Sequence, residues 1–354
     1  MLSHLRPALA FLVGLASAQV PAPQAVPQPG PAGSSTAPYQ PTAILPGGIV
    51  LPLYEPGSKY LKTDRVGEPE HYNMNKDVPG RINSIVNIHN PSIEVHTVDS
   101  GFNTGAAIIV IAGGGHRTLN VGSEGADFVP FFYGYGINTI ILRNRLRSDG
   151  YNPQVDAVHD ALEAVRLVRT HAAEWHIDPK KIGVMGFSAG AELATYAAVT
   201  YPQFDKEGSG NISARPDFAG VIYPGPSPFA PDRPAPPIPI DVPPSFVMCA
   251  GSGDRVHAVW AIQYFSAMLA QGVPNIELHI YGYGRHPGEV LPDGSHMTAG
   301  INNRNGIPFG TWQLRFIDWF RDCGFLDKPG VQTKAAEAVE KYAHEQSLKP
   351  ANKN

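Results

Sequence analysis

The sequence predicts one α/β domain built on a doubly wound, mostly parallel β-sheet. Short continuous apolar runs of strand length alternate along the chain with amphipathic runs of helix length. Continuous apolar strands are typical of a parallel sheet that helices cover on both faces. The chain has 354 residues, 43 % of them hydrophobic, which is enough for one large domain with flanking segments.

The first 18 residues have the pattern of a signal peptide. Arg6 precedes an apolar stretch from Pro7 to Leu15, and small residues follow at 16–18. A buried N-terminal helix is the alternative, but the next segment lacks the apolar periodicity for packing. We therefore expect residues 1–18 to be cleaved and the protein to be secreted or periplasmic. No later run approaches ~20 apolar residues, so we expect no membrane association after cleavage.

Flanking segments bound the predicted catalytic domain, which spans residues 45–328. Residues 19–44 are rich in Pro, Gly, Ala and Gln, which predicts an extended linker. Residues 329–354 form a C-terminal tail, in which 333–345 is expected to be a short solvated helix. Between strands 218–225 and 244–250 the chain is a Pro-rich loop, which predicts only a short cap region.

The elements of the domain follow from the periodicity of its apolar residues. Strands are expected at 92–98, 106–112, 137–143, 181–187, 218–225, 244–250 and 276–283. Helices are expected at 124–136, 155–176, 189–201, 256–272 and 311–324.

Chemistry-bearing residues stand at the carboxyl ends of four of these strands, where ligands bind in such sheets. Ser188 lies in Gly-Phe-Ser-Ala-Gly, between a strand and a helix-forming run. This pentapeptide alone is a weak signal, because a capping serine in an ordinary turn would also satisfy it. Asp254, His286 and the loop 113–116 follow three other strands, and together they favour Ser188 as a nucleophile.

A serine nucleophile needs a base, and the base needs an acid that fixes its tautomer. We assign the base to His286, which directly ends a strand. His257 is expected on the helix after Asp254, and His296 in a turn is the more serious rival. The acid is assigned to Asp254.

Two other carboxylates compete for the role of the acid. Asp217 precedes its strand and is expected at the wrong edge of the sheet, and Asp293 is less well placed.

Backbone amides are the expected stabilisers of a developing oxyanion. Glycine lets backbone N–H groups approach a substrate, so Gly114 and Gly115, together with the amide of Ala189, are the predicted donors. A merely flexible loop is the alternative interpretation of the three glycines.

Other classes of function find little support. The net charge is −4, and we find no basic stripe typical of nucleic-acid binding. No metal-ligand spacing, P-loop or nucleotide fingerprint is found, so no metal or cofactor is expected. Cys249 and Cys323 are interpreted either as buried thiols or as a disulfide. The oligomeric state is not predicted.

Five stretches resemble those of a secreted α/β-hydrolase of the acetylxylan/feruloyl esterase-like group, related to dienelactone hydrolase and prolyl peptidase domains. They lie at 104–116, 123–146, 160–194, 243–256 and 277–288, and the third, with "KIGVMGFSAGAELA", is the most specific. The resemblance implies an α/β-hydrolase fold and the triad Ser188, Asp254 and His286. It also implies cofactor-free hydrolysis of acetyl or feruloyl esters on plant polysaccharide such as xylan.

Departures from the family pattern concern the substrate side. The glycine loop is preceded by Ala112 instead of proline and followed by His116 instead of tyrosine, so His116 is a candidate substrate-binding residue. A small-ester hydrolase or a peptidase of the same fold remains an alternative, since specificity depends on the pocket. A non-catalytic binding protein on a hydrolase scaffold is a further alternative.

Overall fold

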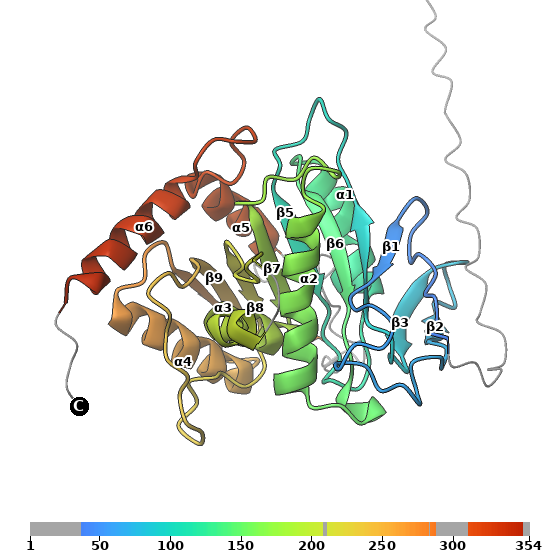
Figure 1. Cartoon of the computed structure of the whole chain (residues 1–354). Coiled ribbons are helices and arrows are strands. Elements are labelled where there is room, and N and C mark those ends of the chain that lie inside the picture. The colour runs from blue at the N-terminus through green and yellow to red at the C-terminus, as the bar shows by residue number, and fades with distance from the viewer. Residues whose placement is uncertain (1–36, 208–210, 283, 288–310, 350–354) are drawn as a thin grey trace, which may run out of the picture.

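A central eight-stranded sheet forms the middle of the molecule (Figure 1). The computed structural model describes residues 37–207, 211–282, 284–287 and 311–349. The sheet has the order β1-β4-β6-β5-β7-β8-β9-β10, and a separate two-stranded sheet pairs β2 with β3. The strands are β1 (Ile49–Pro52), β2 (His71–Met74), β3 (Ile82–Val86), β4 (Ser92–His96), β5 (Ala107–Ile111), β6 (Asn138–Arg143), β7 (Ile182–Phe187), β8 (Ala219–Ile222), β9 (Ser245–Ala250) and β10 (Glu277–Tyr281).

Six strands of this sheet, from β6 to β10, run parallel, and only the edge pairs β1–β4 and β4–β6 are antiparallel. Every residue of β5, β6, β7, β8 and β9 is buried, which explains their largely apolar sequences. The strands β6 and β7, which follow β5 along the chain, lie on opposite sides of β5 in the sheet. The predicted doubly wound α/β fold is confirmed.

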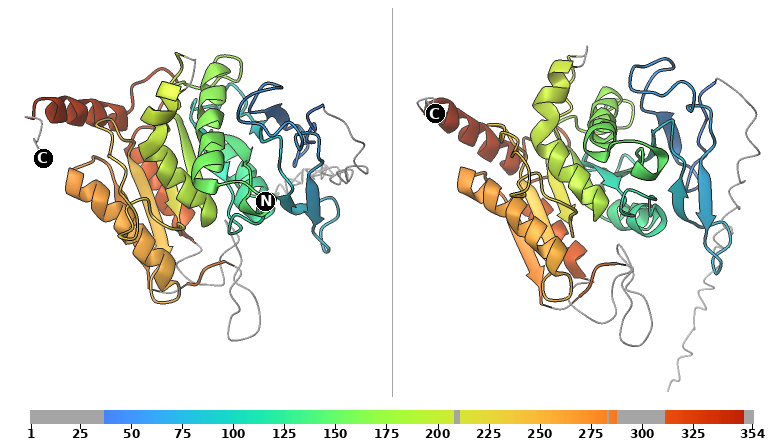
Figure 2. Two further views of the ribbon diagram at one scale, coloured as in Figure 1. Left: turned by 60° about the horizontal axis from the view of Figure 1, so that its bottom comes forward. Right: turned by 90° about the horizontal axis from the view of Figure 1, so that it is seen from below.

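Helices cover both faces of the sheet (Figures 1 and 2). One core cluster contains side chains of α2 (Val158–Thr170), α3 (Ala189–Glu207) and α4 (Arg255–Gln271). A second, more aromatic cluster contains side chains of α1 (Phe128–Tyr133) and α5 (Trp312–Asp322). Both clusters meet the buried strands, so the two layers hold the sheet rigid beneath its loops.

Two of the predicted helices begin differently from the expectation. The segment expected as one helix at 124–136 is a π-helical turn, η1 (Gly122–Ala126), followed by α1. The segment expected at 155–176 begins with a second π-helical turn, η3 (Pro153–Ala157), and α2 ends at Thr170. Pro153 lies at the start of η3, where its missing N–H costs nothing, and Asn152 caps this turn.

The N-terminal part of the domain contains three strands that the sequence did not predict, β1 to β3. Residues 37–44, the end of the predicted linker, lie against the domain, with Ile44 buried. The Ile44 N–H donates to Glu94, and the buried Arg143 donates to Glu94 and to the Thr42 carbonyl. These contacts explain why a segment without apolar periodicity is ordered there. The predicted signal peptide and residues 19–36 lie outside the described residues.

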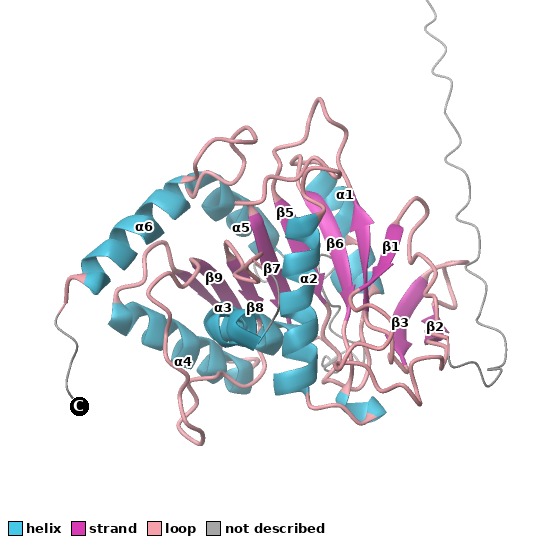
Figure 3. Ribbon diagram, viewed as in Figure 1, coloured by secondary structure: helices cyan, strands magenta, loops and turns pink. Residues whose placement is uncertain are grey.

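The C-terminal tail forms α6 (Lys334–Ser347), a helix capped by Thr333, as expected (Figure 3). One side of this helix is buried, because Ala335, Val339 and Tyr342 pack against the domain. The Tyr342 hydroxyl also donates to the carbonyl of Gln271, at the end of α4. The helix is therefore docked on the domain along one side, whereas the sequence predicted a solvated helix.

Two further expectations concern the cysteines and the membrane. Cys249 and Cys323 are both free and buried, which settles the alternatives in favour of thiols, and burial raises the pKa of each to about 12. Within the described ranges, no helix combines the length and apolar character needed to cross a membrane.

Candidate active site

Ser188 sits on a sharp turn between β7 and α3, in the left-handed backbone region with φ 51°. The two flanking glycines are sterically required. A Cβ on Gly186 would lie 2.1 Å from the Gly190 carbonyl oxygen, and a Cβ on Gly190 would lie 2.0 Å from that of Ile111. The Ser188 N–H donates to the carbonyl of Ile222 in β8, which fixes the turn on the sheet. The strained backbone therefore presents the hydroxyl above the strand ends.

Ser188, His286 and Asp254 form one hydrogen-bonded chain. Ser188 Oγ lies 2.9 Å from His286 Nε2, and His286 Nδ1 lies 2.9 Å from Asp254 Oδ2. Because Nδ1 faces a carboxylate, it carries the ring proton and leaves Nε2 free to accept the serine proton. The structure thus brings together the three side chains that the sequence assigned to separate strand ends.

Asp254 is held as an ionised carboxylate at the start of α4. Its side chain is only 4 % exposed. Burial alone would raise its pKa, but hydrogen bonds from His257 and His286 outweigh burial and lower the pKa to about 2. A residue at a helix N-terminus often caps it, yet this carboxylate makes no cap bond because both its oxygens accept from imidazoles.

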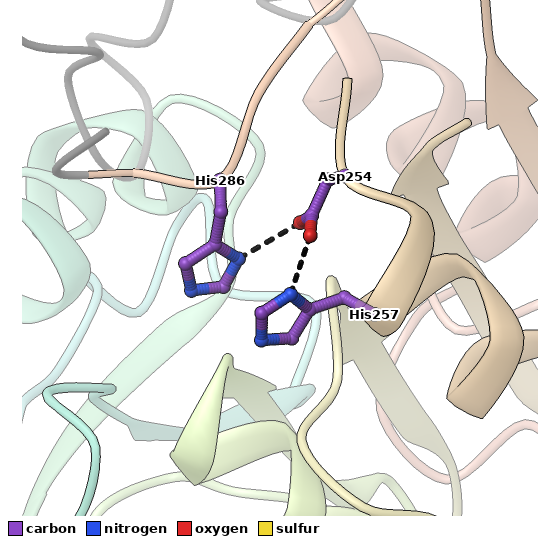
Figure 4. A group of neighbouring side chains, drawn as sticks. All are labelled: Asp254, His257 and His286. Carbon is purple, nitrogen blue, oxygen red and sulfur yellow. Dashed lines mark hydrogen bonds and ion pairs between the residues drawn. The ribbon is translucent and has the colours of Figure 1, made fainter. Parts of the chain in front are cut away.

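His257 lies on α4, as expected, and is the second imidazole on Asp254. Its Nδ1 is 2.6 Å from Asp254 Oδ1, and its ring stacks on that of His286 with the centroids 3.7 Å apart (Figure 4). From the sequence, His257 was expected only as a rival for the role of the base. Its i, i+3 spacing from Asp254 across the first turn of α4 is the signal that could have predicted the shared carboxylate.

The glycine loop after β5 lies beside Ser188. Gly114 needs the backbone freedom of glycine, with φ 131° and a position where a Cβ would lie 2.2 Å from the Thr118 carbonyl oxygen. Among the described residues, no protein acceptor takes the N–H of Gly114 or Gly115. Ala189 is the first residue of α3, where N–H groups lack intrahelical partners. All three amides are therefore available to an anion.

His116 follows this loop and also has a left-handed backbone, with φ 58°. Its side chain is buried, and Nε2 lies 2.9 Å from Glu192 Oε2 on α3. Glu192 in turn accepts a hydrogen bond from Gln154. The ring thus fastens the loop to the helix that follows Ser188, and direct contact with a substrate stays a prediction.

Glu124 is a buried carboxyl group beneath the loop that the sequence analysis did not select. It accepts hydrogen bonds from the Gly113 N–H at 2.8 Å and from the Tyr223 hydroxyl at 2.8 Å. The Tyr223 ring packs edge-on against His286, with the centroids 5.4 Å apart. Burial raises the pKa of Glu124 to about 7, although these hydrogen bonds act in the opposite direction. One side chain therefore connects the glycine loop to a residue that packs on the histidine.

The rival residues from the sequence analysis lie elsewhere or outside the described part. Asp217 precedes β8 at the opposite edge of the sheet, where it pairs with Arg169 and Arg215. His296 and Asp293 lie outside the described residues.

Sequence comparisons find similarity to one family model and to two characterised proteins, each over about a third of the chain. Residues 94–222 match the sequence model of the BD-FAE family. An acetylxylan esterase of Xylanibacter ruminicola is 30 % identical over 121 residues, which are 34 % of this chain and 23 % of that protein. Endo-1,4-beta-xylanase B of Butyrivibrio fibrisolvens is 32 % identical over 120 residues, 33 % of this chain and 19 % of that protein. The matched region spans less than a quarter of the length of either relative.

Solved structures share the fold over a larger part of the chain. An acetyl ester-xyloside bifunctional hydrolase of Caldicellulosiruptor lactoaceticus superposes with a TM-score of 0.58 and 24 % identity, covering 80 % of this chain and 99 % of that one. An esterase of Thermogutta terrifontis gives a TM-score of 0.53 and 23 % identity, covering 69 % and 91 %. The comparisons confirm the α/β-hydrolase fold and the resemblance to its esterases that the sequence predicted.

Proposed function

We propose that the protein is a serine carboxylic-ester hydrolase that removes acyl groups, acetyl or feruloyl, from plant polysaccharide such as xylan. The observation that carries the proposal is the continuous chain from Ser188 Oγ through His286 to Asp254, with 2.9 Å at each step. Hydrogen bonds of this length join a nucleophile, a base and an orienting acid in hydrolases of this type.

The proposed reaction begins with attack of Ser188 Oγ on the ester carbonyl while its proton moves to His286 Nε2. The N–H groups of Gly114, Gly115 and Ala189 then stabilise the oxyanion. Each such donor typically lowers the activation barrier by ~3 kcal/mol. His286 then gives the proton to the ester oxygen of the sugar as its bond to the acyl carbon breaks, so the sugar leaves with a free hydroxyl and an acyl-enzyme remains. Water, deprotonated by the same histidine, then releases the acid and restores the serine.

Carbohydrate esters are proposed as the substrate class because of the relatives. Both curated relatives are named for xylan, one for an esterase and one for a xylanase. The match to the BD-FAE family model, residues 94–222, contains Ser188, the glycine loop and Glu124. Sequence similarity therefore coincides with the part of the chain that carries the nucleophile and the proposed oxyanion donors.

Acetate release from acetylated xylan tests this proposal, with p-nitrophenyl acetate as a second substrate. Wild type is expected to hydrolyse both, and Ser188→Ala to lose activity on both while unfolding at the wild-type temperature. Inertness of the folded wild type on both substrates would contradict esterase function. Turnover of p-nitrophenyl acetate alone would restrict the protein to small esters.

Two variants test the identity of the base. If His286→Ala retains most of the turnover and His296→Ala abolishes it, the assignment of His286 is wrong.

Secretion is part of the proposal and rests on the pattern of residues 1–18. Expression of the full chain in an exporting host should yield extracytoplasmic protein that begins near residue 19. Protein that stays inside the cell with residues 1–18 intact would contradict this localisation.

A further inference from the structure

Asp254 is shared between two imidazoles, only one of which the proposed hydrolytic reaction uses. Nδ1 of His286 faces one carboxylate oxygen at 2.9 Å, and Nδ1 of His257 faces the other at 2.6 Å. The two rings are nearly parallel, with an interplanar angle of 8° (Figure 4). His257 therefore brings a second imidazole to Asp254, whereas the proposed hydrolysis needs only that of His286.

The three side chains together have the composition of a transition-metal site. One ligand atom from each of Asp254, His257 and His286 can be chosen so that all three lie within 4.8 Å of one another. Imidazole nitrogen and carboxylate oxygen are ligands that Zn²⁺ prefers, and three protein ligands with one open position are typical of zinc sites that also bind water. Hard cations such as Mg²⁺, which prefer oxygen ligands, fit this set less well.

Metal binding requires the three ligand atoms, which lie within 4.8 Å of one another, to rearrange around one ion. Zinc–ligand bonds of about 2.1 Å at a tetrahedral angle place neighbouring ligand atoms roughly 3.4 Å apart. The two nitrogen–oxygen separations here, 2.9 and 2.6 Å, would have to open by about 0.5–0.8 Å from their hydrogen-bonded values. Because the two rings are nearly parallel, the histidine side chains must also rotate so that both Nδ1 lone pairs point at one ion, and both side chains are partly exposed, 19 % for His257 and 18 % for His286.

We propose that Asp254, His257 and His286 bind a divalent transition-metal ion of the Zn²⁺ type, and that the bound ion switches off ester hydrolysis. In the metal-free site each Nδ1 carries a proton that faces Asp254. A metal on His286 Nδ1 takes that lone pair, so the ring proton moves to Nε2. Nε2 then donates to Ser188 instead of accepting its proton, and the serine cannot be activated. The proposed metal binding does not depend on the proposed function, whereas the proposed inhibition rests on it.

Calorimetric titration of Zn²⁺ into Ser188→Ala tests binding without any need for activity. This background keeps all three ligands, and we expect one strongly bound ion per chain. The double variant Ser188→Ala/His257→Gln, in which the glutamine amide can still donate to Asp254, should bind Zn²⁺ at least about 10- to 100-fold more weakly, because loss of even an outer-shell partner of a metal ligand typically costs that much. Adding His279→Gln is the matched control, because His279 pairs with the single carboxylate of Glu277 away from this cluster. It should leave the affinity unchanged.

Inhibition of wild-type p-nitrophenyl acetate hydrolysis by Zn²⁺, with reversal by a chelator, tests the switch. His257→Gln should need at least about tenfold more Zn²⁺ for half inhibition. Equal Zn²⁺ affinity with and without His257→Gln, or no binding by Ser188→Ala, would overturn the site. Tight binding that depends on His257 but leaves wild-type turnover unchanged would overturn the switch. A wild type without esterase activity contradicts the proposed function only, since the calorimetry still decides the metal site.

Discussion

Replacement of Glu124 by glutamine should remove a specific pH dependence of stability. Glu124 is almost fully buried, and burial raises its pKa from 4.5 to about 7. Between these two pH values the folded protein keeps the proton that the unfolded chain has lost. The free energy of unfolding therefore falls as the pH rises through this window and levels off above about pH 7.

The size of the effect follows from the two pKa values. Each pH unit of difference is worth about 1.4 kcal/mol, so a rise from 4.5 to about 7 corresponds to about 3 kcal/mol in total. Roughly 2.5 kcal/mol of this falls between pH 5 and pH 8, because the unfolded carboxyl is already partly ionised at pH 5. Glutamine has nearly the same shape, accepts from Gly113 through its oxygen, and does not ionise.

Urea unfolding of wild type and Glu124→Gln at pH 5, 6, 7 and 8 measures this contribution. The difference in unfolding free energy between the two proteins should shift by about 2.5 kcal/mol in favour of the variant across that range. Glu340→Gln, on the exposed side of α6, is the control and should follow the wild-type curve. A difference between wild type and Glu124→Gln that stays constant within about 0.5 kcal/mol would refute the reasoning.

Three further predictions concern the acid, the serine turn and the C-terminal helix. Asp254→Asn should lower kcat by around 10⁴, because the base loses its correct tautomer; a loss of only a few-fold would place the acid elsewhere. Gly190→Ala should reduce soluble folded protein or lower the unfolding temperature strongly, since its Cβ would lie 2.0 Å from the Ile111 carbonyl oxygen; wild-type stability would contradict this. Tyr342→Phe should lower the unfolding free energy by about 1 kcal/mol through loss of the hydrogen bond to Gln271, measured by urea unfolding; an unchanged value would mean that the bond contributes nothing.

The sequence alone was sufficient for the seven strands β4 to β10 of the central sheet and for the turn that carries Ser188, because both depend on local patterns. Continuous apolar runs such as 106–112 and 182–187 are recognisable without knowing their neighbours. The glycines around Ser188 satisfy a backbone requirement that acts within five residues. Strands β1 and β2 were missed because most of their residues are exposed or only partly buried, and β3 was missed because polar residues interrupt its short apolar run, although most of it is buried.

Contacts between distant segments were decided only by the tertiary structure. Nothing local in the sequence indicates that Glu124 meets Tyr223 and the Gly113 amide, because those partners come from different strand ends. The docking of α6 likewise depends on the end of α4. His257 stands three residues from Asp254, yet its stacking on His286 requires the loop after β10 to approach α4. Local patterns therefore determined which residues stand at the sheet edge, while packing between elements decided which of them share one carboxylate.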